Sequence, residues 1–253
     1  MASGDLLESR TADIDISSIE ELEIQGYIGG FNLAFIRDLC GGTDSLLLGG
    51  RHLRILNLKK AFFDKGQEVY YSRDGEDLVI KRNNEIPSYA FEGCYVLNSI
   101  VLPDIIGGWI TINKRAFANC ILLKKIEWGG HISRIKEEAF LNCYSIEDDI
   151  ILPEGLKEIG NRAFRNTHVV NIVIPSTVKN IGSCVFTDII GDVVINAEIP
   201  PNIKIDTFVF SKSSNRRLYV PLKYIEKYMV EPYISVFKEI KAIESSRIDA
   251  AVG

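Results

Sequence analysis

The chain has 253 residues, 46% of them hydrophobic, so it can bury a substantial core in one domain or two. Its formal net charge of −5 and its isolated basic pairs argue against a nucleic-acid partner. No apolar run approaches the ~18–20 residues of a membrane helix, and the first residues lack the order of a signal peptide. We therefore expect either a cytosolic protein or a mature chain whose export signal has been removed.

The N-terminal third predicts divergent repeats interrupted by a helix and a hairpin. Apolar residues at 19–24 and 53–58 have the spacing of half-buried strands and predict two rungs. Residues 31–40 are apolar at helical spacing and precede a Gly-Gly pair, which predicts a helix that ends there. Two short apolar runs flank Asp74-Gly75, and this dipeptide predicts a hairpin between them.

A repeat dominates the rest of the chain. The motif Pro-x-x-Leu-x-x-Ile-Gly-x-x-Ala-Phe at residues 153–164 returns with small changes at residues 175–186. Its closing phenylalanine recurs every 22 to 26 residues, and such a period is typical of a solenoid, in which each repeat rests on its neighbours. The phenylalanines of this series are Phe91, Phe117, Phe140, Phe164, Phe186 and Phe208.

Each repeat also contains a strand pattern, Leu-x-x-Ile-x-Leu, which places alternate side chains inward and outward. Together with the N-terminal rungs we count eight such patterns, which predict one long parallel sheet with roughly 4.8 Å between strands. The Ala-Phe half predicts a short turn or irregular helix on the opposite face, with the phenylalanines as its apolar spine. The fold class we expect is an α+β repeat solenoid.

The C-terminal stretch at residues 222–243 has apolar side chains at helical spacing. We expect it to form a helical cap on the stack, followed by a polar tail at residues 245–253. We therefore divide one continuous domain into N-terminal rungs at 1–85, regular repeats at 86–221, and the cap with its tail at 222–253.

Three of the five cysteines occupy one position of the repeat, three residues after a phenylalanine: Cys94, Cys120 and Cys143. This regularity predicts buried free thiols that pack as small hydrophobic groups. A disulfide between neighbouring rungs stays open on Cα distance alone, although parallel Cβ vectors would strain it. The sequence contains no Cys-x-x-Cys pair, so a structural zinc site has little support.

The consensus Cys-x-x-Leu-x-x-Ile-x-Leu-Pro-x-x-Val-x-x-Ile-Gly-x-x-Ala-Phe resembles the BspA-like leucine-rich repeats of bacterial and protist surface proteins. The match covers about residues 86–243, with departures such as Lys136 in place of the glycine and Asn166 or Thr167 in place of the cysteine. The resemblance implies a right-handed leucine-rich-repeat coil. It also implies export, cell-surface display and adhesion, as in Bacteroidetes proteins, and it carries no catalytic residues.

Motifs for chemistry are absent from the sequence. It contains no His-Glu-x-x-His, Gly-x-Ser-x-Gly or Walker string, and we expect His131 and His168 in exposed loops. The acidic run at residues 147–149 offers fewer ligands than the 6–8 oxygens that calcium prefers, so a solvated bend is the simpler interpretation. We expect no enzyme, no metal site and no cofactor.

The candidate binding residues lie on the outward side of the predicted sheet. An apolar stripe there would mark a partner site, although β-branched residues favour strands whichever way they face. The first outward row is Val101, Glu127, Ile151, Val173, Val194 and Tyr219, and the second is Ser99, Lys125, Asp149, Asn171, Asp192 and Arg217. From these we predict a partner-binding surface made of the first row together with Lys125, Asn171 and Arg217.

Three functions are compatible with this pattern. The first is a monomeric, non-catalytic adhesion or protein-interaction module, extracellular or on the cell surface, that binds a protein or glycan of a host or microbial surface. The second is an inert spacer in a surface assembly. The third is a glycan hydrolase that uses carboxylates on separate rungs, such as Glu127 and Asp149, held ~5–9.5 Å apart.

Overall fold

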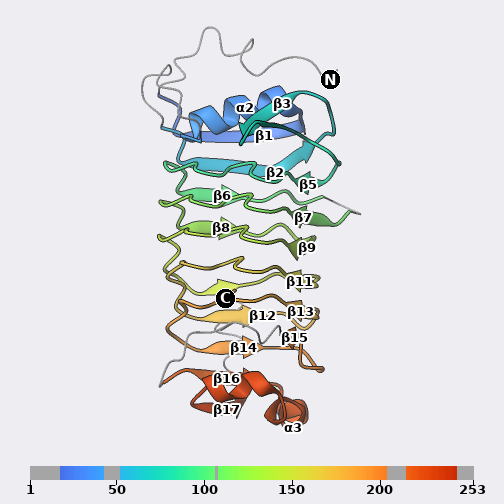
Figure 1. The fold of residues 1–253 in the computed structure, drawn as a ribbon, viewed down its shortest axis with the longest axis vertical. Helices are drawn as coiled ribbons and strands as arrows, with labels where there is room; N and C mark the ends of the chain where they lie inside the picture. The colour runs from blue at the N-terminus through green and yellow to red at the C-terminus, as the bar shows by residue number, and fades with distance from the viewer. Residues whose placement is uncertain (1–17, 43–51, 106–107, 204–214, 244–253) are drawn as a thin grey trace.

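The computed structural model describes residues 18–42, 52–105, 108–203 and 215–243. Over these residues the chain winds into coils stacked along one long axis, and this confirms the predicted solenoid (Figure 1). Phe208 and the predicted tail at 245–253 lie outside the described residues.

One side of the stack, which we call the wall, consists of two parallel sheets. The strands of the first are β1 (Glu21–Ile28), β2 (Ile55–Phe63), β6 (Ser99–Val101) and β8 (Lys125–Glu127). The strands of the second are β10 (Ile150–Ile151), β12 (Ile172–Ile174), β14 (Val193–Ile195), β16 (Arg217–Val220) and β17 (Glu239–Ala242).

The wall is therefore not the single sheet that the sequence predicted. It divides between β8 and β10, where the repeat carries one extra residue and the exposed run Glu147, Asp148, Asp149 precedes the strand. The eight predicted rungs are all strands of the wall, and β17 adds a ninth.

A third parallel sheet, which the sequence did not predict, runs along another side of the stack (right side in Figure 1). Each of its strands contributes at least one buried isoleucine, such as Ile135 or Ile159. Its strands, in spatial order, are β15 (Asn202–Ile203), β13 (Asn180–Ile181), β11 (Glu158–Ile159), β9 (Ile132–Ile135), β7 (Ile110–Ile112) and β5 (Glu85–Ile86).

The Ala-Phe segments form irregular turns, as predicted, and these turns are held by hydrogen bonds between coils. The Phe117 amide donates to the Ala139 carbonyl at 2.8 Å, and the Phe140 amide donates to the Ala163 carbonyl at 2.8 Å. Each turn contains residues with positive φ, and in one coil these are Glu138 at 58° and Asn142 at 61°. The turn can repeat because asparagine tolerates this left-handed conformation better than most residues.

The phenylalanine spine is confirmed for the five described rings. Neighbouring rings from Phe91 to Phe186 stack nearly parallel, with centroid separations of 5.2, 5.2, 5.3 and 5.8 Å along the series. Every one of these five side chains is at most 1% exposed. Full burial of a phenylalanine contributes ~1.5–3 kcal/mol, so the spine is a major part of the core.

The cysteine ladder is confirmed as free thiols. All five cysteines are unpaired, and only Cys184 is partly exposed. Cys120 and Cys143 donate from Sγ to the carbonyls of Phe91 and Phe117, each at 3.1 Å. Burial raises the pKa of the Cys143 thiol well above its usual range. Thr167 takes the ladder position in the next coil and donates to Phe164 O at 2.7 Å.

The N-terminal end of the stack has the helix and hairpin that the sequence predicted. These are α2 (Gly30–Leu39), β3 (Val69–Arg73) and β4 (Glu76–Val79). From α2 the buried Arg37 reaches the first turn, where it donates to the carbonyls of Tyr89 and Ala90, and its Nη2 donates to Gly42 O at 2.8 Å. In the following turns, backbone amides of the preceding coil donate hydrogen bonds to the equivalent carbonyl oxygens. Arg37 thus supplies the donors that a preceding coil would supply.

The C-terminal cap is shorter in helix than predicted. It contains η2 (Leu222–Tyr224), α3 (Ile225–Met229) and η3 (Pro232–Val236), but residues 239–242 form β17, which pairs with β16. The prediction of helix through residue 243 is wrong for this last segment. Parallel pairing satisfies backbone groups at the edge of the wall that a helix would leave open.

Candidate interaction surface

The first outward row is in register across the second sheet of the wall. Ile151 pairs with Val173, Val173 with Val194, and Val194 with Tyr219. Ile151 is 42% exposed, and Val173 and Val194 are partly exposed. These three residues form a short apolar stripe.

Tyr219 is not part of the exposed stripe, and its assignment as a solvent-facing contact is wrong. Its side chain is only 4% exposed. Arg217, two residues earlier on the same face of β16, hydrogen-bonds to Tyr219, and this bond raises the pKa of Arg217. Strand alternation predicts on which side of the sheet a side chain lies, but it cannot predict whether that side chain is covered.

On the first sheet of the wall the same row is more polar. Val101 pairs with Glu127, and Ser99 pairs with Lys125 on the adjacent row. Lys125 and Glu127 are exposed, whereas Val101 is partly buried. The structure thus brings together Val101, Glu127 and Lys125 in one half of the wall, and the apolar stripe lies in the other half.

The second outward row forms a ladder between coils. Asn171 donates through its backbone amide and Nδ2 to Asp149 Oδ1, at 3.1 and 2.9 Å, and its own Oδ1 accepts from the Asp192 amide at 2.7 Å. The Arg217 amide donates to Asp192 Oδ1 at 3.1 Å, and its Nε donates to Glu239 at 3.0 Å. Asn171 and Arg217, which we predicted to contact a partner, therefore already serve to join neighbouring coils.

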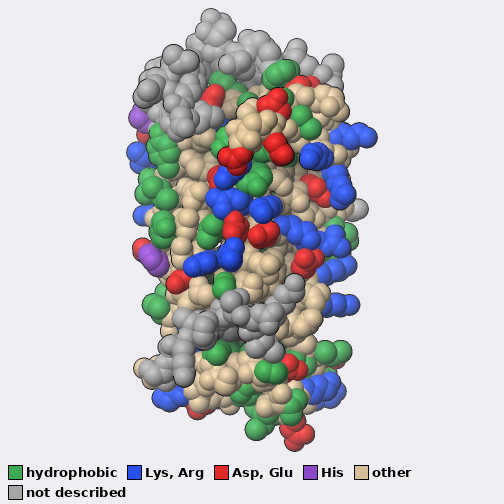
Figure 2. Space-filling model, in the orientation of Figure 1, with side chains coloured by type: hydrophobic (Ala, Val, Ile, Leu, Met, Phe, Trp, Pro, Cys, Tyr) green, Lys and Arg blue, Asp and Glu red, His purple; other side chains and the backbone are tan. Residues whose placement is uncertain are grey.

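Sequence reasoning missed a second apolar feature, the corner ridge, which lies where the turns lead into the wall strands. Hydrophobic side chains follow this edge of the molecule from coil to coil (left edge in Figure 2). Four of its side chains are 40–47% exposed and Ile190 is 70% exposed. The ridge comprises Tyr95, Ile121, Leu122, Tyr144, His168 and Ile190.

The ridge has one recurring member per coil. Its signal in the sequence is an apolar or aromatic residue four positions after each of the five spine phenylalanines from Phe91 to Phe186. The rings of Tyr144 and His168 lie 6.1 Å apart, so neighbouring members are within reach of one contact surface. Exposed aromatic residues on a rigid repeat are typical of protein-binding surfaces.

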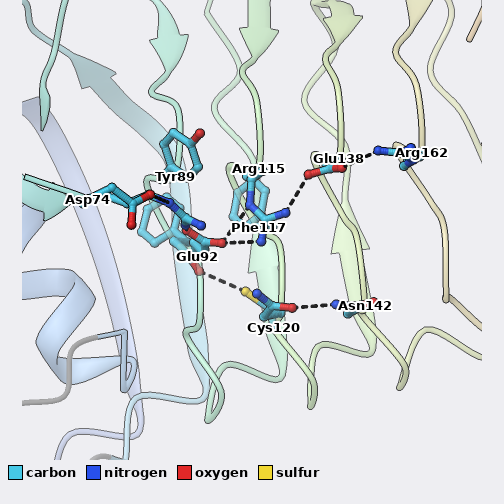
Figure 3. A network of polar contacts seen from close by, with 12 residues as sticks. Asp74, Tyr89, Glu92, Arg115, Phe117, Cys120, Glu138, Asn142 and Arg162 are labelled. Atoms are coloured by element: carbon cyan, nitrogen blue, oxygen red, sulfur yellow. Dashed lines mark hydrogen bonds and ion pairs between the residues drawn. The ribbon is translucent and has the colours of Figure 1, made fainter. Parts of the chain in front are cut away.

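In contrast to the corner ridge, the middle of the turns carries charged side chains. Acidic and basic side chains are mixed on the face drawn in Figure 2. Figure 3 shows Arg115 between Glu92 and Glu138, and Glu138 between Arg115 and Arg162. Arg115 contacts both carboxylates at 2.6 Å, and Arg162 contacts Glu138 at 3.2 Å. Arg73 pairs with Glu92 at the N-terminal end of the ladder.

Burial acts to raise the pKa of Glu138, but hydrogen bonds and charge from Arg115 and Arg162 outweigh it and hold the pKa below its usual range. A carboxylate fixed in its ionised form between two guanidinium groups serves to join coils.

Within the described ranges, no cluster of three or more His, Cys, Asp or Glu side chains is placed to hold a metal ion. The described helices are also too short or too polar to cross a bilayer. The expected loop histidine His131 is partly exposed and lies 3.3 Å from Asp104.

Comparison with known proteins assigns the repeats. Residues 66–191 match the family model described as the BspA type leucine-rich repeat region, in six copies. The comparison with curated proteins gave no match.

Solved structures with similar coils include bacterial leucine-rich repeat proteins. One from T. pallidum is 24% identical, with a TM-score of 0.41, over 66% of this chain and 64% of that protein. One from Eubacterium ventriosum is 18% identical, with a TM-score of 0.45, over 70% of this chain and 40% of that protein. The pneumococcal vaccine antigen PcpA is 16% identical, with a TM-score of 0.46, over 89% of this chain and 68% of that one. The chain thus spans less than two thirds of the first two proteins.

Proposed function

Because the chain belongs to the BspA-type leucine-rich repeat proteins, we propose that it is a non-catalytic interaction module that binds a protein through the wall and the corner ridge. The observation that carries the proposal is the corner ridge, a row of exposed side chains on adjacent coils, five of which are 40–70% exposed. Apolar surface that stays exposed in this regular way is a feature of partner sites.

The chemistry of the ridge and stripe favours a protein partner. Tyr95 and Tyr144 offer large, rigid contact area, and tyrosine is among the residues that dominate interface energies. Ile151, Val173 and Val194 extend this apolar surface onto the wall. A glycan, the other partner class that the sequence left open, is an alternative outcome of the test below.

One of the two candidate catalytic residues of the hydrolase hypothesis has a structural role instead. Asp149 accepts two hydrogen bonds from Asn171 and anchors the ladder between coils, so its carboxylate already has a structural role. Our proposal therefore includes no catalytic step. An extracellular or cell-surface location completes it, supported by the family resemblance.

Site-specific photo-crosslinking tests the assignment. A photoreactive residue is placed at Ile151 or at Tyr144. A control probe is placed at Asn180, which is exposed on β13 of the third sheet, outside the wall. Each labelled protein is incubated with host matrix proteins and with bacterial surface fractions, and a glycan array is run in parallel.

We expect crosslinked protein from Ile151 and Tyr144 and little from Asn180. Equal or stronger crosslinking from Asn180 would contradict the proposed face. Binding to the glycan array, without protein crosslinks, would contradict the protein class of the partner. An inert spacer would give no specific crosslink from any of the three positions.

A further inference from the structure

We propose that a second copy of this chain occupies the corner ridge, packed antiparallel about a two-fold axis that passes between β8 and β10. The proposal deepens the proposed function by naming the partner, and it departs from the monomer that we expected from the sequence. It follows from the way in which charge and apolar surface are distributed over the coils on either side of that axis.

The charges change sign from one coil to the next. Lys124 and Lys125 are exposed at the start of β8, and by the repeat they occupy the positions that Asp148 and Asp149 occupy before β10. Glu147 adds a third exposed carboxylate to the second coil. A basic group and an acidic group of similar size therefore lie side by side, next to the ridge.

This arrangement is self-complementary under a two-fold rotation. A rotation about an axis perpendicular to both the strands and the stacking axis, at the level between the two coils, places Lys124 and Lys125 of one copy against Glu147 and Asp148 of the other, and it does so twice. A parallel pairing would instead bring like charges together, which is unfavourable. In an isologous interface, the same patch serves both copies.

The apolar residues follow the same symmetry. The rotation places Ile121 and Leu122 against Tyr144, and Tyr95 against His168. Each of these side chains is exposed in the single chain. The spine rings show that successive coils are spaced by 5.2–5.3 Å across these repeats. Because that spacing is nearly constant, the ridge residues of the two copies remain opposite one another over four coils.

Charge-exchange variants test the pairing. One variant carries Lys124→Glu and Lys125→Glu, and another carries Glu147→Lys and Asp148→Lys. Asp149 is left intact because it holds Asn171. A third variant combines all four substitutions in one chain. Oligomeric state is measured by sedimentation equilibrium up to the highest soluble concentration, with circular dichroism and denaturant unfolding as controls for folding.

We expect the wild-type chain to dimerise and each two-residue variant to dimerise at least ~10-fold more weakly, because every lost pair counts twice and ~1.4 kcal/mol is tenfold in affinity. The four-residue variant should recover the wild-type affinity. An equimolar mixture of the two two-residue variants should form a heterodimer, since one then carries only acidic groups and the other only basic groups at the contact. Added salt should weaken the wild-type dimer.

A wild-type chain that stays monomeric at every concentration would overturn the proposal. Failure of the four-residue variant and of the mixture to recover association, while both remain folded, would overturn it as well. These failures are distinct from a failure of the proposed function. A monomer whose Tyr144 probe still captures a foreign protein would keep the interaction module and lose only the self-association.

Discussion

Phe140 and Tyr144 lie four residues apart in one coil and have opposite environments. Phe140 is fully buried and stacks between the rings of Phe117 and Phe164, at 5.2 and 5.3 Å. Tyr144, on the corner ridge, is 42% exposed. The turns thus place their side chains in contacts between coils, whereas the corner leaves large apolar side chains in water.

The same contrast holds for polar groups. Glu138 on the turns is enclosed by two arginines, while Glu147 beside the ridge is exposed. A side chain that joins coils is needed for folding, and a side chain that joins nothing is available for a partner. The comparison therefore predicts large stability effects on the turns, and small stability effects with large association effects at the ridge.

The largest stability effect is expected at the spine. Phe140→Ala should lower the free energy of unfolding by about 3–5 kcal/mol, because it opens a cavity between two stacked rings. Tyr144→Ala is the matched control in the same coil, and we expect it to cost less than about 1 kcal/mol. Urea unfolding followed by circular dichroism measures both. Similar losses for the two variants would remove the contrast between turn and ridge.

The N-terminal end should respond nearly as strongly. Arg37→Leu keeps an apolar side chain in the core but leaves the Ala90 and Glu92 carbonyls without their donor. At ~1–3 kcal/mol for each buried acceptor left unsatisfied, we expect a loss of about 3 kcal/mol in the free energy of unfolding. Arg54→Leu, at an exposed arginine on the wall, is the control. A stable Arg37→Leu protein would show that the first coil needs no cap.

A smaller effect is expected in the asparagine ladder of the turns. Asn142 has φ of 61°, donates to Asn119 at 2.7 Å and accepts from Asn166 at 2.7 Å. Asn142→Ala should cost about 1–2 kcal/mol, because alanine resists this conformation and makes neither hydrogen bond. Asn142→Gly loses the same bonds without the steric penalty and should be the more stable variant in thermal unfolding. The opposite order would mean that the backbone conformation is unimportant.

The smallest effect depends on pH. Because the pKa of Glu138 is lowered on folding, its contribution to stability is present above its unfolded pKa and is lost as pH falls through the folded value. The stability difference between wild type and Glu138→Gln should therefore be constant near neutral pH and shrink in acid. Urea titrations between pH 7 and pH 3 measure it, with Glu147→Gln as the control. A difference that does not change with pH would show that the ion pairs stabilise nothing.

The features that the sequence predicted well are those whose apolar residues recur once in every repeat. The wall strands and the spine recur in every coil, so each phenylalanine supports the assignment of the others. The third sheet was not predicted because strands such as β11 and β13 have only two residues each, with one buried isoleucine. A run of two residues is too short to show the alternation of a strand.

Three details of the structure could not be predicted from the spacing of residues, for physical reasons. Alternation predicts which way Tyr219 points and says nothing of what covers it. The extra residue before Ile150 was visible in the sequence, but its effect, the division of the wall, depends on pairing geometry. Arg37 is fully buried although charged residues seldom are, because it satisfies carbonyls that only the folded stack brings together.

The central claim is that the corner ridge serves association and contributes little to folding. The most direct measurement compares wild type with the triple variant Ile121→Ser, Leu122→Ser and Tyr144→Ser by sedimentation equilibrium and by urea unfolding on the same preparations. The account predicts that self-association is lost while the free energy of unfolding of the monomer falls by no more than about 1–2 kcal/mol in total, as for exposed sites. A variant that unfolds far more easily, or one that associates as well as wild type, would contradict it.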